Sequence, residues 1–529
     1  MAALRHNKIS GRYRTRESSG FVETVKRWLG FSMPPGERPF DGTGGGRRTR
    51  NWGATSGGPN AVTLGSLQTQ RNQSRDLARK VPWVASAIEA VAADIVGQGI
   101  RPSSLALSKE FRTEVEALFR DWIMESDADG IASFYGQQLL AVRTMIEAGE
   151  CFIRFRPRRL SDGLSVPLQV QILEPEFVPL DNAMGMVPRP GNVIKQGIEF
   201  DKLGRRVAYW MYREHPYDYS GIGRLRSLEV VRVPADEVLH LFKPVRPGQV
   251  RGVPWLSTVI IRVRDLLEYE DAELVRKKTA AMFVAFVTKN ANGDNVLPID
   301  DDEALDDPSD DESAPLTMEP GSIQQLEEGE STEFSNPPDS GNNYEAFLRT
   351  QLRAIASALG AMYEAVTGDY SNSNFSNARM GRMMTQRRTS PVQDGVNFQM
   401  NIPIWKRFIK DAVTYGMLKA PAFTDNPRDY MRVDFVAPGW PYANPKEEAA
   451  ADQLRIQSGL ASRRGVARER GKEIEDVDRE ISEDNARADR LEIVTTSDGR
   501  WAVKQPTPAS ADGGASTEGA ASGGAKAGA

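Results

Sequence analysis

The stretch SRDLARKVPWVASAIEAVAADIVGQGIRP, residues 74–102, joins a basic start, a proline–aromatic step and an apolar segment that runs into two glycines. Its apolar residues recur at steps of three and four positions: Val84, Ile88, Val91 and Ile95. This spacing predicts an amphipathic helix with one stripe facing a core. Gly97 and Gly99 are expected to end the helix. An ordinary packed helix explains these residues, which by themselves specify no function.

The length and composition of the chain indicate a large protein with more than one domain. It has 529 residues, of which 40% are hydrophobic and 26% are charged, and domains usually span about 100 to 200 residues. The longest apolar run, AAMFVAFV at residues 280–287, is far shorter than the roughly 20 residues of a membrane span. The N-terminal MAALRHNKISGRYRTRESS has no apolar stretch after its basic residues. No signal peptide is therefore expected, and we predict an intracellular protein.

The chain offers few residues for metal or disulfide chemistry. Cys151 is the single cysteine, so no disulfide can form within the chain, and the three histidines are His6, His215 and His240. A zinc cluster is hard to assemble from this set. The acidic run PIDDDEALDDPSDDES, residues 298–313, lacks the glycine and closing glutamate of a calcium loop and is interpreted as a solvated segment. We expect no cofactor, and we expect His240 to be a satisfied residue of a strand.

Charge and local composition separate an arm, a structured centre and a tail. The net charge of −5 argues against a protein whose main task is to grip nucleic acid through its phosphates. Residues 1–60 are rich in Arg, Gly and Ser and are predicted to be a flexible arm, and residues 501–529 a flexible tail.

The first half of the centre has strand-like runs, and this predicts an α+β region. ECFIRFRPR from Glu150, LQVQILEP from Leu168 and EVLHLF from Glu237 are short, rich in β-formers and bounded by Pro, Gly and charged residues. The segment QGIEFDKLGRRVAYWMYRE is predicted to be a hairpin that turns at Asp201–Gly204.

Two long helices with an insertion between them are predicted next. The first is PWLSTVIIRVRDLLEYEDAELVRKKTAAMFVAFV, which begins at Pro254 and is too charged for the core of a monomer. The second has apolar residues at alternating steps of four and three, the spacing of a narrow packing seam. Small residues, mostly alanine, lie between these apolar residues and allow a neighbouring helix to approach closely. The seam consists of Leu348, Leu352, Ile355, Leu359, Met362 and Val366. The insertion, residues 291–342, carries the acidic run and a short strand-like element near MEPGSIQQLEEGESTEF.

Several of these segments together resemble one protein family. They are the opening stretch, RPGQVRGVPWLS, PGSIQQLEEGESTEFSNP, FLRTQLRAIASALGAMYEAVTGDYSNSNFSNARM and ANPKEEAAADQLRIQSGLAS. In this order, from about Arg47 to about Asp484, the chain is similar to the lambda-type portal proteins of tailed bacteriophages. The resemblance implies an α+β portal fold, assembled as a ring of about a dozen copies with closed symmetry.

The resemblance also implies how the chain is divided. Residues 61–255 would form a β-rich wing, 256–290 and 343–366 the two stem helices, and 291–342 an inserted clip with the acidic insertion. Residues 367–378 would form a loop facing the DNA channel, and 379–500 the long helices of the wing and crown.

Three sets of residues then receive roles. The channel loop and the helix that follows would contact DNA weakly, through Tyr370, Asn372, Asn374, Phe375, Ser376, Asn377, Arg379 and Arg382. A surface loop with Phe375 against a neighbouring subunit is the alternative. The seam residues Leu348, Leu352, Ile355, Leu359, Met362 and Val366 would pack subunits together in the stem. In the clip, a partner-docking patch or a merely solvated loop would consist of Asp300, Asp301, Asp302, Asp306, Asp307, Asp310, Asp311 and Glu312.

The implied role is a portal at one capsid vertex, through which DNA is packaged and ejected. Its partners would be double-stranded DNA passing without sequence specificity, the terminase large subunit, major capsid and scaffold proteins, and head-completion or tail connector proteins, with no membrane. The protein would be found in the virion, and in the host cytoplasm during assembly.

Two other functions were weighed against a portal. A packaging ATPase needs a phosphate-binding loop, but GVARERGKE, residues 465–473, has five residues between its glycines and a glutamate where Ser or Thr would bind magnesium. GIGRLRS, residues 221–227, lacks a surrounding βαβ pattern, and no carboxylate pair stands out as catalytic. A scaffold or minor head protein remains the structural alternative, although a scaffold would lack the β-rich part. We expect no enzymatic activity.

Overall fold

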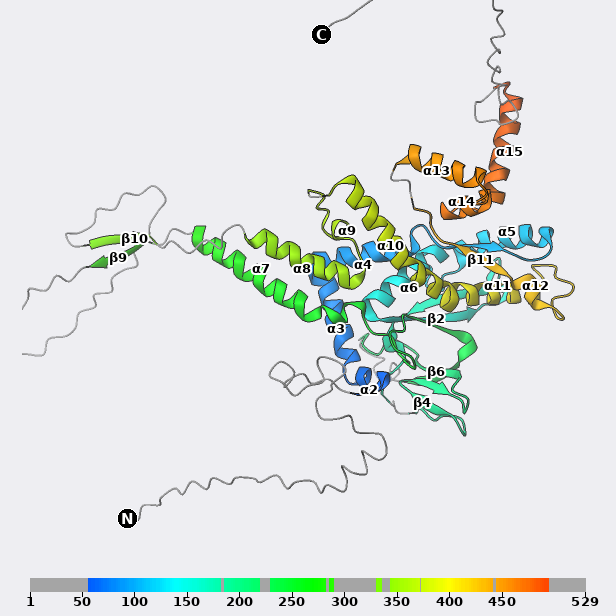
Figure 1. The fold of residues 1–529 in the computed structure, drawn as a ribbon. Helices are drawn as coiled ribbons and strands as arrows, with labels where there is room; N and C mark the ends of the chain where they lie inside the picture. The colour runs from blue at the N-terminus through cyan, green and yellow to red at the C-terminus, as the bar shows by residue number, and fades with distance from the viewer. Residues whose placement is uncertain are drawn as a thin grey trace, which may run out of the picture. The chain divides into compact units, whose positions relative to one another are not determined.

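The structure, a computed structural model, describes residues 56–181, 185–218, 229–281, 285–289, 330–334, 343–371, 373–440 and 444–493 (Figure 1). All of its helices and strands belong to the unit that begins at Pro59. The helices are α2 (Pro59–Leu64), α3 (Leu67–Lys80), α4 (Pro82–Val96), α5 (Lys109–Glu125), α6 (Phe134–Ala148), α7 (Ile260–Ala281), α8 (Asn343–Leu359), α9 (Tyr363–Thr367), α10 (Phe375–Val396), α11 (Ile402–Thr414), α12 (Pro427–Met431), α13 (Pro445–Gln457), α14 (Arg463–Glu469) and α15 (Ile474–Arg490).

The described strands form four antiparallel sheets. They are β1 (Arg101–Ser104), β2 (Glu150–Pro157), β3 (Leu168–Leu173), β4 (Val193–Lys195), β5 (Ile198–Phe200), β6 (Arg206–Tyr212), β7 (Val230–Pro234), β8 (Val238–Phe242), β9 (Ala285–Lys289), β10 (Glu330–Phe334) and β11 (Val433–Val436). The sheet orders are β3-β2-β8, β4-β5-β6-β7, β1-β11 and β9-β10. The predicted strands after Glu150, Leu168 and Glu237 are confirmed, and so is the hairpin, which joins β5 to β6.

Helix α4 is the element around which the other helices pack. The predicted stripe is confirmed, since Val84, Ile88 and Ile95 are all buried. Pro82 lies at the first position of α4, where a missing N–H is tolerated. Gly97 ends the helix with a φ of 52°, a backbone conformation that L side chains rarely adopt. α4 contacts α3, α6, α8, α9 and α10, so the stretch quoted first forms the centre of the fold.

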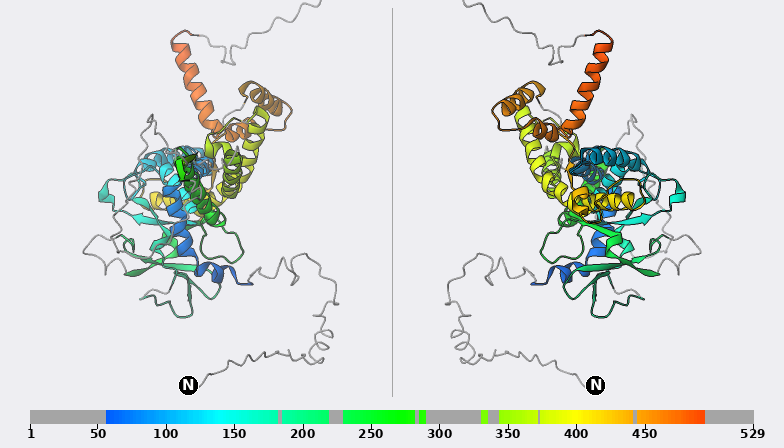
Figure 2. Two further views of the ribbon diagram at one scale, coloured as in Figure 1. Left: turned by 90° about the vertical axis from the view of Figure 1, so that its left-hand side faces the viewer. Right: turned by 90° about the vertical axis from the view of Figure 1, so that its right-hand side faces the viewer.

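The β3-β2-β8 sheet lies between a helical layer and the β4-β5-β6-β7 sheet, and the strands of these two sheets lie on one side of the helices (Figures 1 and 2). Successive side chains of β2 point to opposite faces of the sheet, so the strand can contact a different core on each face. Cys151 and Ile153 belong to the large core that includes α6 and α11. Phe152, between them, packs in a second core with Tyr209 of β6 and Val233 of β7. Strand β2 is therefore buried on both faces.

The first stem helix is shorter than predicted. α7 ends at Ala281, and Ala285–Lys289 is a strand, β9, that pairs with β10 at Glu330–Phe334. The prediction of a helix to residue 290 is wrong over this last part, while the predicted strand-like element near residue 330 is confirmed. The run AAMFVAFV is apolar throughout and therefore carries no periodicity that separates strand from helix.

The second stem helix is also divided. α8 ends at Leu359, Gly360 has a φ of 81°, and Met362 is extended before α9 begins at Tyr363. A single helix to Val366 was predicted, and this is wrong because the left-handed Gly360 stops α8. Gly368 ends α9 in the same conformation, with a φ of 68°.

A long bent helical segment follows the loop after α9. Pro391 lies inside α10, where it cannot donate a backbone hydrogen bond. A π-helical turn, Asn397–Asn401, then joins α10 to α11. Pro403, at the start of α11, has no N–H to donate to Gln399 four residues earlier, so the wide turn lies where that bond is missing. No helix among the described residues is long and apolar enough to cross a membrane.

Candidate functional site

The loop between α9 and α10 is short and bonded to itself. The Asp369 carboxylate accepts hydrogen bonds from the Ser371 backbone N–H at 3.0 Å and from the Tyr363 hydroxyl at 3.1 Å. Hydrogen bonds from Ser371 and Tyr363 lower the pKa of Asp369. The Asn374 side chain accepts from the Asn377 N–H at 2.8 Å and caps α10. These polar side chains therefore bond to backbone groups of their own loop, which stabilises its turns and the start of α10.

Most predicted channel residues are exposed, but several are helical. Tyr370 and Phe375 are 63% and 56% exposed. Phe375 is the first residue of α10, so the prediction of a loop to Ala378 is wrong, because the Asn374 cap starts the helix earlier. The exposed members of the set are Tyr370, Asn374, Phe375, Ser376, Asn377 and Arg379. Arg382 is half-buried, with its guanidinium 5.8 Å from the centre of the Trp440 ring, and Asn372 lies outside the described residues.

The start of α10 is basic and carries exposed methionines. Between Asp369 and Asp394 the sequence has no acidic residue, and its arginines are Arg379, Arg382, Arg387 and Arg388. The exposed methionines are Met380, Met383 and Met384. On such a surface the arginines can contact the phosphates of a polyanion, while the methionines add uncharged area that does not attract phosphates. We call residues 369–388 the loop–α10 segment.

The loop–α10 segment is anchored on α4. The Ser86 hydroxyl donates to the carbonyl of Val366, at the end of α9, with a distance of 2.8 Å. Further along, the Gln393 side chain donates to the carbonyl of Ile95 at 2.9 Å. The residues that flank the segment on both sides are therefore tied to the same central helix. Within it Thr385 is buried, while most of the other described residues are exposed.

The predicted stem seam is buried inside its own subunit. Leu352, Ile355 and Leu359 are at most 3% exposed and belong to the large core with residues of α4 and α7. Val366 is equally buried, and Leu348 packs against the same core. The prediction that this seam joins subunits is wrong for the buried residues, because α8 uses it to pack on its own chain. Met362 is partly buried. The acidic set from Asp300 to Glu312 lies outside the described residues.

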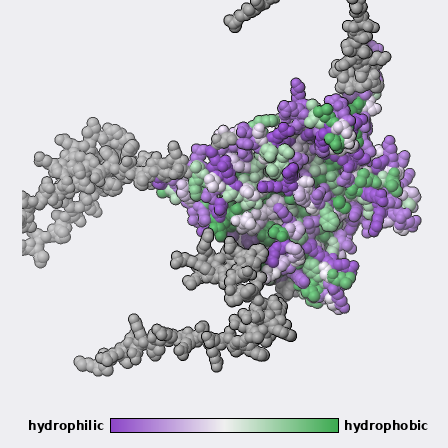
Figure 3. Space-filling view, viewed as in Figure 1, coloured by the Kyte–Doolittle hydropathy of each residue, from purple (hydrophilic) through white to green (hydrophobic). Residues whose placement is uncertain are grey.

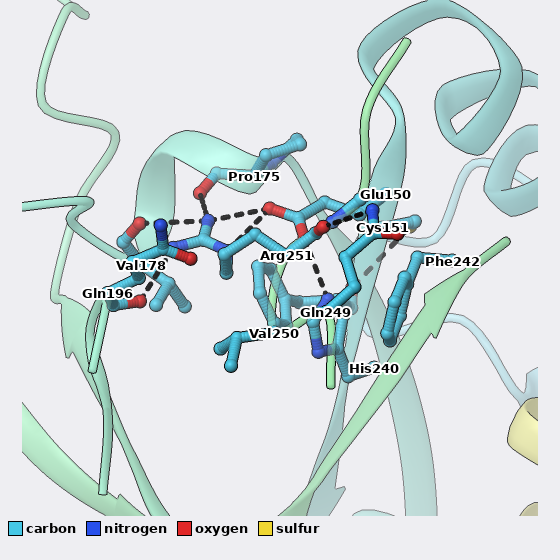
Figure 4. Close-up of polar contacts among 12 residues, drawn as sticks. Glu150, Cys151, Pro175, Val178, Gln196, His240, Phe242, Gln249, Val250 and Arg251 are labelled. Carbon is cyan, nitrogen blue, oxygen red and sulfur yellow. Dashed lines mark hydrogen bonds and ion pairs between the residues drawn. The ribbon is translucent and has the colours of Figure 1, made fainter. Parts of the chain in front are cut away.

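A buried ionic cluster joins the two larger sheets to the segment that leads into α7 (Figure 4). Glu150, at the start of β2, is 0% exposed and accepts four hydrogen bonds. One oxygen accepts from Arg71 and from Arg251 Nε at 2.7 Å. The other accepts from His240 Nε2 at 2.8 Å and from the Gly252 N–H at 2.7 Å. We call Arg71, Glu150, His240 and Arg251 the Glu150 cluster.

Arg251 connects four chain segments through this cluster. Beyond Glu150, its guanidinium donates to the carbonyls of Gln196 at 2.8 Å, Pro175 at 3.1 Å and Val178 at 3.2 Å. These carbonyls belong to the turn after β3 and to the loop before β5. The η4 turn (Trp255–Thr258), which precedes α7, begins four residues later. RPGQVRG, residues 246–252, therefore positions the start of α7 on the two larger sheets.

Burial and charge set opposite protonation preferences in the cluster. Burial alone raises the pKa of Glu150, but Arg251, Arg71 and the hydrogen bond from His240 outweigh it and hold that pKa well below its usual range. Burial lowers the pKa of His240 to about 4, although the bond to Glu150 opposes this shift. His240 is therefore neutral at pH 7, with Nε2 donating to Glu150 and Nδ1 3.2 Å from Arg206. The expectation of a satisfied strand histidine is confirmed.

This arrangement predicts a specific loss of stability in acid. His240 has a folded pKa of about 4 and an unfolded pKa near 6.5, so between these values the unfolded chain binds more protons. Its contribution is complete above pH 6.5 and is lost as the pH falls to 4, by about 3 kcal/mol. His240→Gln, which keeps a donor and an acceptor, should lack this part of the pH dependence. Urea unfolding at pH 7.0, 5.5 and 4.5 measures it, and parallel curves for both proteins would contradict the assignment.

Two glycines make room for the cluster. A Cβ atom added to Gly252 would lie 2.1 Å from the Gly149 carbonyl oxygen. Gly252→Ala should therefore destabilise the subunit by about 1–3 kcal/mol, the usual cost of forcing atoms into a packed site. Gly395→Ala, in α10, meets nothing within 4 Å and should stabilise by about 0.5–1 kcal/mol. Chemical unfolding of both variants tests this, and a neutral Gly252→Ala would refute the close contact.

One further group of side chains has the donor types of a metal site. Oxygen or nitrogen atoms of Glu174, Glu176 and His215 lie within 4.8 Å of one another. Arg75 already engages both carboxylates, at 2.8 Å from Glu176 and 3.3 Å from Glu174, and His215 bonds to Glu174 at 3.1 Å. The group is thus accounted for as an ion-pair cluster around Arg75.

Sequence reasoning missed the Glu150 cluster, although part of its signal was visible. The RPGQVRG motif was recognised as specific, yet no role was given to its Arg251. The local signal that was not used is a charged residue next to a glycine on both sides of the contact, at Gly149–Glu150 and Arg251–Gly252. Its remaining members, Arg71 and His240, lie far away in sequence, so only the fold brings the four together.

Comparison with known proteins identifies similar chains. Residues 45–393 match the family described as "Phage portal protein, lambda family". The chain is 26% identical over 471 residues to the "Probable portal protein" of Halomonas phage phiHAP-1, covering 84% of this chain and 86% of that protein. It is 22% identical over 371 residues to "Portal protein B" of Escherichia phage lambda, covering 64% and 67%. Among solved structures it resembles a chain of the "Neck of native GTA particle computed with C12 symmetry", with a TM-score of 0.42, 12% identity and coverage of 74% and 89%.

Proposed function

The chain belongs to the lambda family of phage portal proteins, and on this basis we propose that it forms the ring-shaped DNA channel at one vertex of a phage capsid. The observation that carries the proposal is the family match over residues 45–393, which includes α4, α7, α8 and the whole loop–α10 segment. The ring would contain about a dozen copies with closed symmetry. It would pass DNA during packaging and ejection.

We propose that the loop–α10 segment lines this channel. The support is that Tyr370, Asn374, Ser376 and Arg379 are exposed and that both ends of the segment are anchored on α4. Uncharged amides and hydroxyls would give DNA only weak contacts, while the arginines of α10 would touch phosphates briefly. Such contacts are independent of sequence, because phosphates carry no base information.

Packing between subunits is proposed to use the outward faces of the stem helices. With the α8 seam buried inside the subunit, α7 still presents large apolar side chains to the surroundings: Ile261 is 75% exposed, Val275 61% and Leu274 52%. The face seen in Figure 3 is mostly hydrophilic, with small, separate hydrophobic patches. A second subunit beside α7 would cover apolar residues that a monomer leaves in water.

The remaining regions receive roles by the same proposal. The sheets would form the wing, with the helices after α10 in the wing and crown. The acidic residues from Asp300 to Glu312 would lie in a clip that attracts a basic surface of the terminase large subunit or of a connector protein. Capsid, scaffold and tail connector proteins would be further partners, in the virion and earlier in the host cytoplasm.

We propose that the protein is a structural conduit without enzymatic activity. The stretch GVARERGKE forms α14 and the turn into α15, whereas a phosphate-binding loop follows a strand. Titration with nucleotide tests the ATPase alternative, since a portal should neither bind nor hydrolyse it.

The direct test of the proposed function is negative-stain microscopy of the purified full-length protein. Rings with a central hole are expected in moderate salt at micromolar concentration. Light scattering of the same sample should give a mass many times that of one subunit. Monomers under these conditions would contradict the proposal, and long open polymers or solid particles would favour another structural head protein.

A further inference from the structure

Three arginines form a ladder along the end of β2. Arg154, Arg156 and Arg158 alternate with Phe155 and Pro157, so they share the strand face that also carries Phe152. Phe152 is covered by the second sheet, but the three arginines lie beyond the covered part and are each half-buried. With β7 they line a groove of about 370 Å³. We call it the arginine groove.

The groove carries an excess of positive charge. Arg156 is held by the Gln171 side-chain oxygen at 2.9 Å, and Arg158 by that of Gln169 at 2.7 Å, so both are oriented by neutral partners. Burial lowers the pKa of Arg156, and Arg154 and Arg158 lower it further. In the described part of the chain, none of the three guanidiniums has a carboxylate oxygen within the 4.0 Å of an ion pair.

Two acidic residues at the groove, Glu237 and Glu199, are already paired with arginines, and the nearby Asp129 accepts a hydrogen bond from Gln171 and opposes the lowering of the Arg156 pKa. Glu237, which lines it, pairs with Arg407 at 3.0 Å. Glu199 pairs at 2.8 Å with Arg232, the fourth arginine of the lining. The arginine ladder therefore places like charges side by side in a partly desolvated groove. Such an arrangement raises the free energy of the unoccupied site and favours an anionic ligand.

We propose that the arginine groove binds an extended acidic peptide segment of a partner protein. Alternate side chains on one face of a strand repeat about every 6.4 to 6.8 Å, which is twice the rise per residue. An extended peptide with a carboxylate at every second position has the same repeat. It can present one carboxylate to each of Arg154, Arg156 and Arg158. The proposal concerns the wing surface and is independent of the channel.

The shape of the groove favours a peptide over duplex DNA. The guanidiniums are half-buried between β2 and the strand β7 of the neighbouring sheet. A single extended chain fits a space of about 370 Å³ that is lined on both sides. Duplex DNA is far wider, and it would reach only the rim of the groove.

Fluorescence anisotropy with the full-length assembled protein tests the proposal. The probe is a labelled twelve-residue peptide of alternating Thr and Glu. Its competitors are an isomer with all Thr before all Glu, and a single-stranded and a duplex oligonucleotide with the same number of charges. The variant R154Q/R156Q/R158Q removes the ladder. The matched control R264Q/R479Q/R487Q removes three exposed arginines elsewhere.

The alternating peptide should bind, and the ladder variant should bind it at least about tenfold more weakly. The control should stay within about twofold, and the block isomer should compete less well. Equal loss in both variants would reduce the binding to general charge and overturn the proposal. It would also be overturned by no binding of the peptide, or by an oligonucleotide that competes as well as the peptide. Unchanged ring assembly and melting temperature of the ladder variant establish that its fold is intact.

Discussion

Replacing Glu150 by glutamine is expected to destabilise the subunit by about 3–5 kcal/mol, the range measured when one partner of a buried ion pair is removed. Glu150 is 0% exposed, and both of its oxygens accept two hydrogen bonds. The amide of glutamine cannot accept at both ends, and it carries no charge. Arg71 and Arg251 would then remain buried, at 1% and 0% exposure, without the carboxylate between them.

Guanidinium unfolding followed by circular dichroism, at one fixed protein concentration, measures this loss. The matched control is Glu268→Gln, which breaks the pair between Arg264 and Glu268 at 3.0 Å, with side chains 75% and 65% exposed. Exposed pairs contribute about 0–1 kcal/mol, so the control should barely change the transition. A Glu150→Gln loss below about 1 kcal/mol would show that the cluster does not hold the sheets and the segment before α7 together.

Added positive charge on the loop–α10 segment is expected to make the channel retain DNA. The double variant Asn372→Lys/Ser376→Lys leaves Asn374 in place, because that residue caps α10. Each new phosphate contact should steepen the salt dependence of log affinity by about 0.9. With about a dozen subunits in a closed ring, even partial engagement of the new lysines multiplies this effect. Packaging should slow, and duplex DNA should remain on the ring at salt concentrations that release it from the original protein.

The matched control places aspartate at the same two positions. Aspartates in this segment repel phosphates, so the ring should still assemble while DNA retention falls or stays low. A lysine variant with the original packaging rate and DNA retention would contradict the channel assignment. Equal retention by both variants would assign the effect to altered structure and not to charge.

Local pattern predicted much of this fold. Helix α4 and strands β2, β3 and β8 were predicted from spacing and composition, because their apolar residues repeat with the period of the element that forms. The ends of the two predicted stem helices, α7 and α8, were not predicted correctly. The steps of four and three continue across Gly360 to Met362 and Val366, and Val366 in α9 is buried in the same core as the α8 residues. The apolar repeat therefore gives no sign that the helix ends at this point, which the positive φ of Gly360 shows.

The candidate site was predicted in part, for a similar reason. The polar composition of the loop after Val366 indicates its turns and cap, which are local. The two hydrogen bonds that anchor it on α4, from Ser86 to Val366 and from Gln393 to Ile95, join residues that are 280 and 298 positions apart in the sequence. The Glu150 cluster combines residues 71, 150, 240 and 251. Which charges become partners depends on strand pairing, and no local spacing carries that information.

The measurement that tests the central claim most directly is the position of the loop–α10 segment in the assembled ring. Cys151, the single cysteine of the chain, is 0% exposed, and burial raises its pKa, so a thiol placed elsewhere can be labelled selectively. Ser376→Cys carries the label on the segment. Leu203 lies in the turn between β5 and β6 and is 77% exposed, so Leu203→Cys carries the label on the proposed wing. After maleimide–gold labelling, averaged images should show density at the central hole for Ser376→Cys and near the rim for Leu203→Cys. Gold from Ser376→Cys at the periphery of the ring, or no ring at all, would contradict the account.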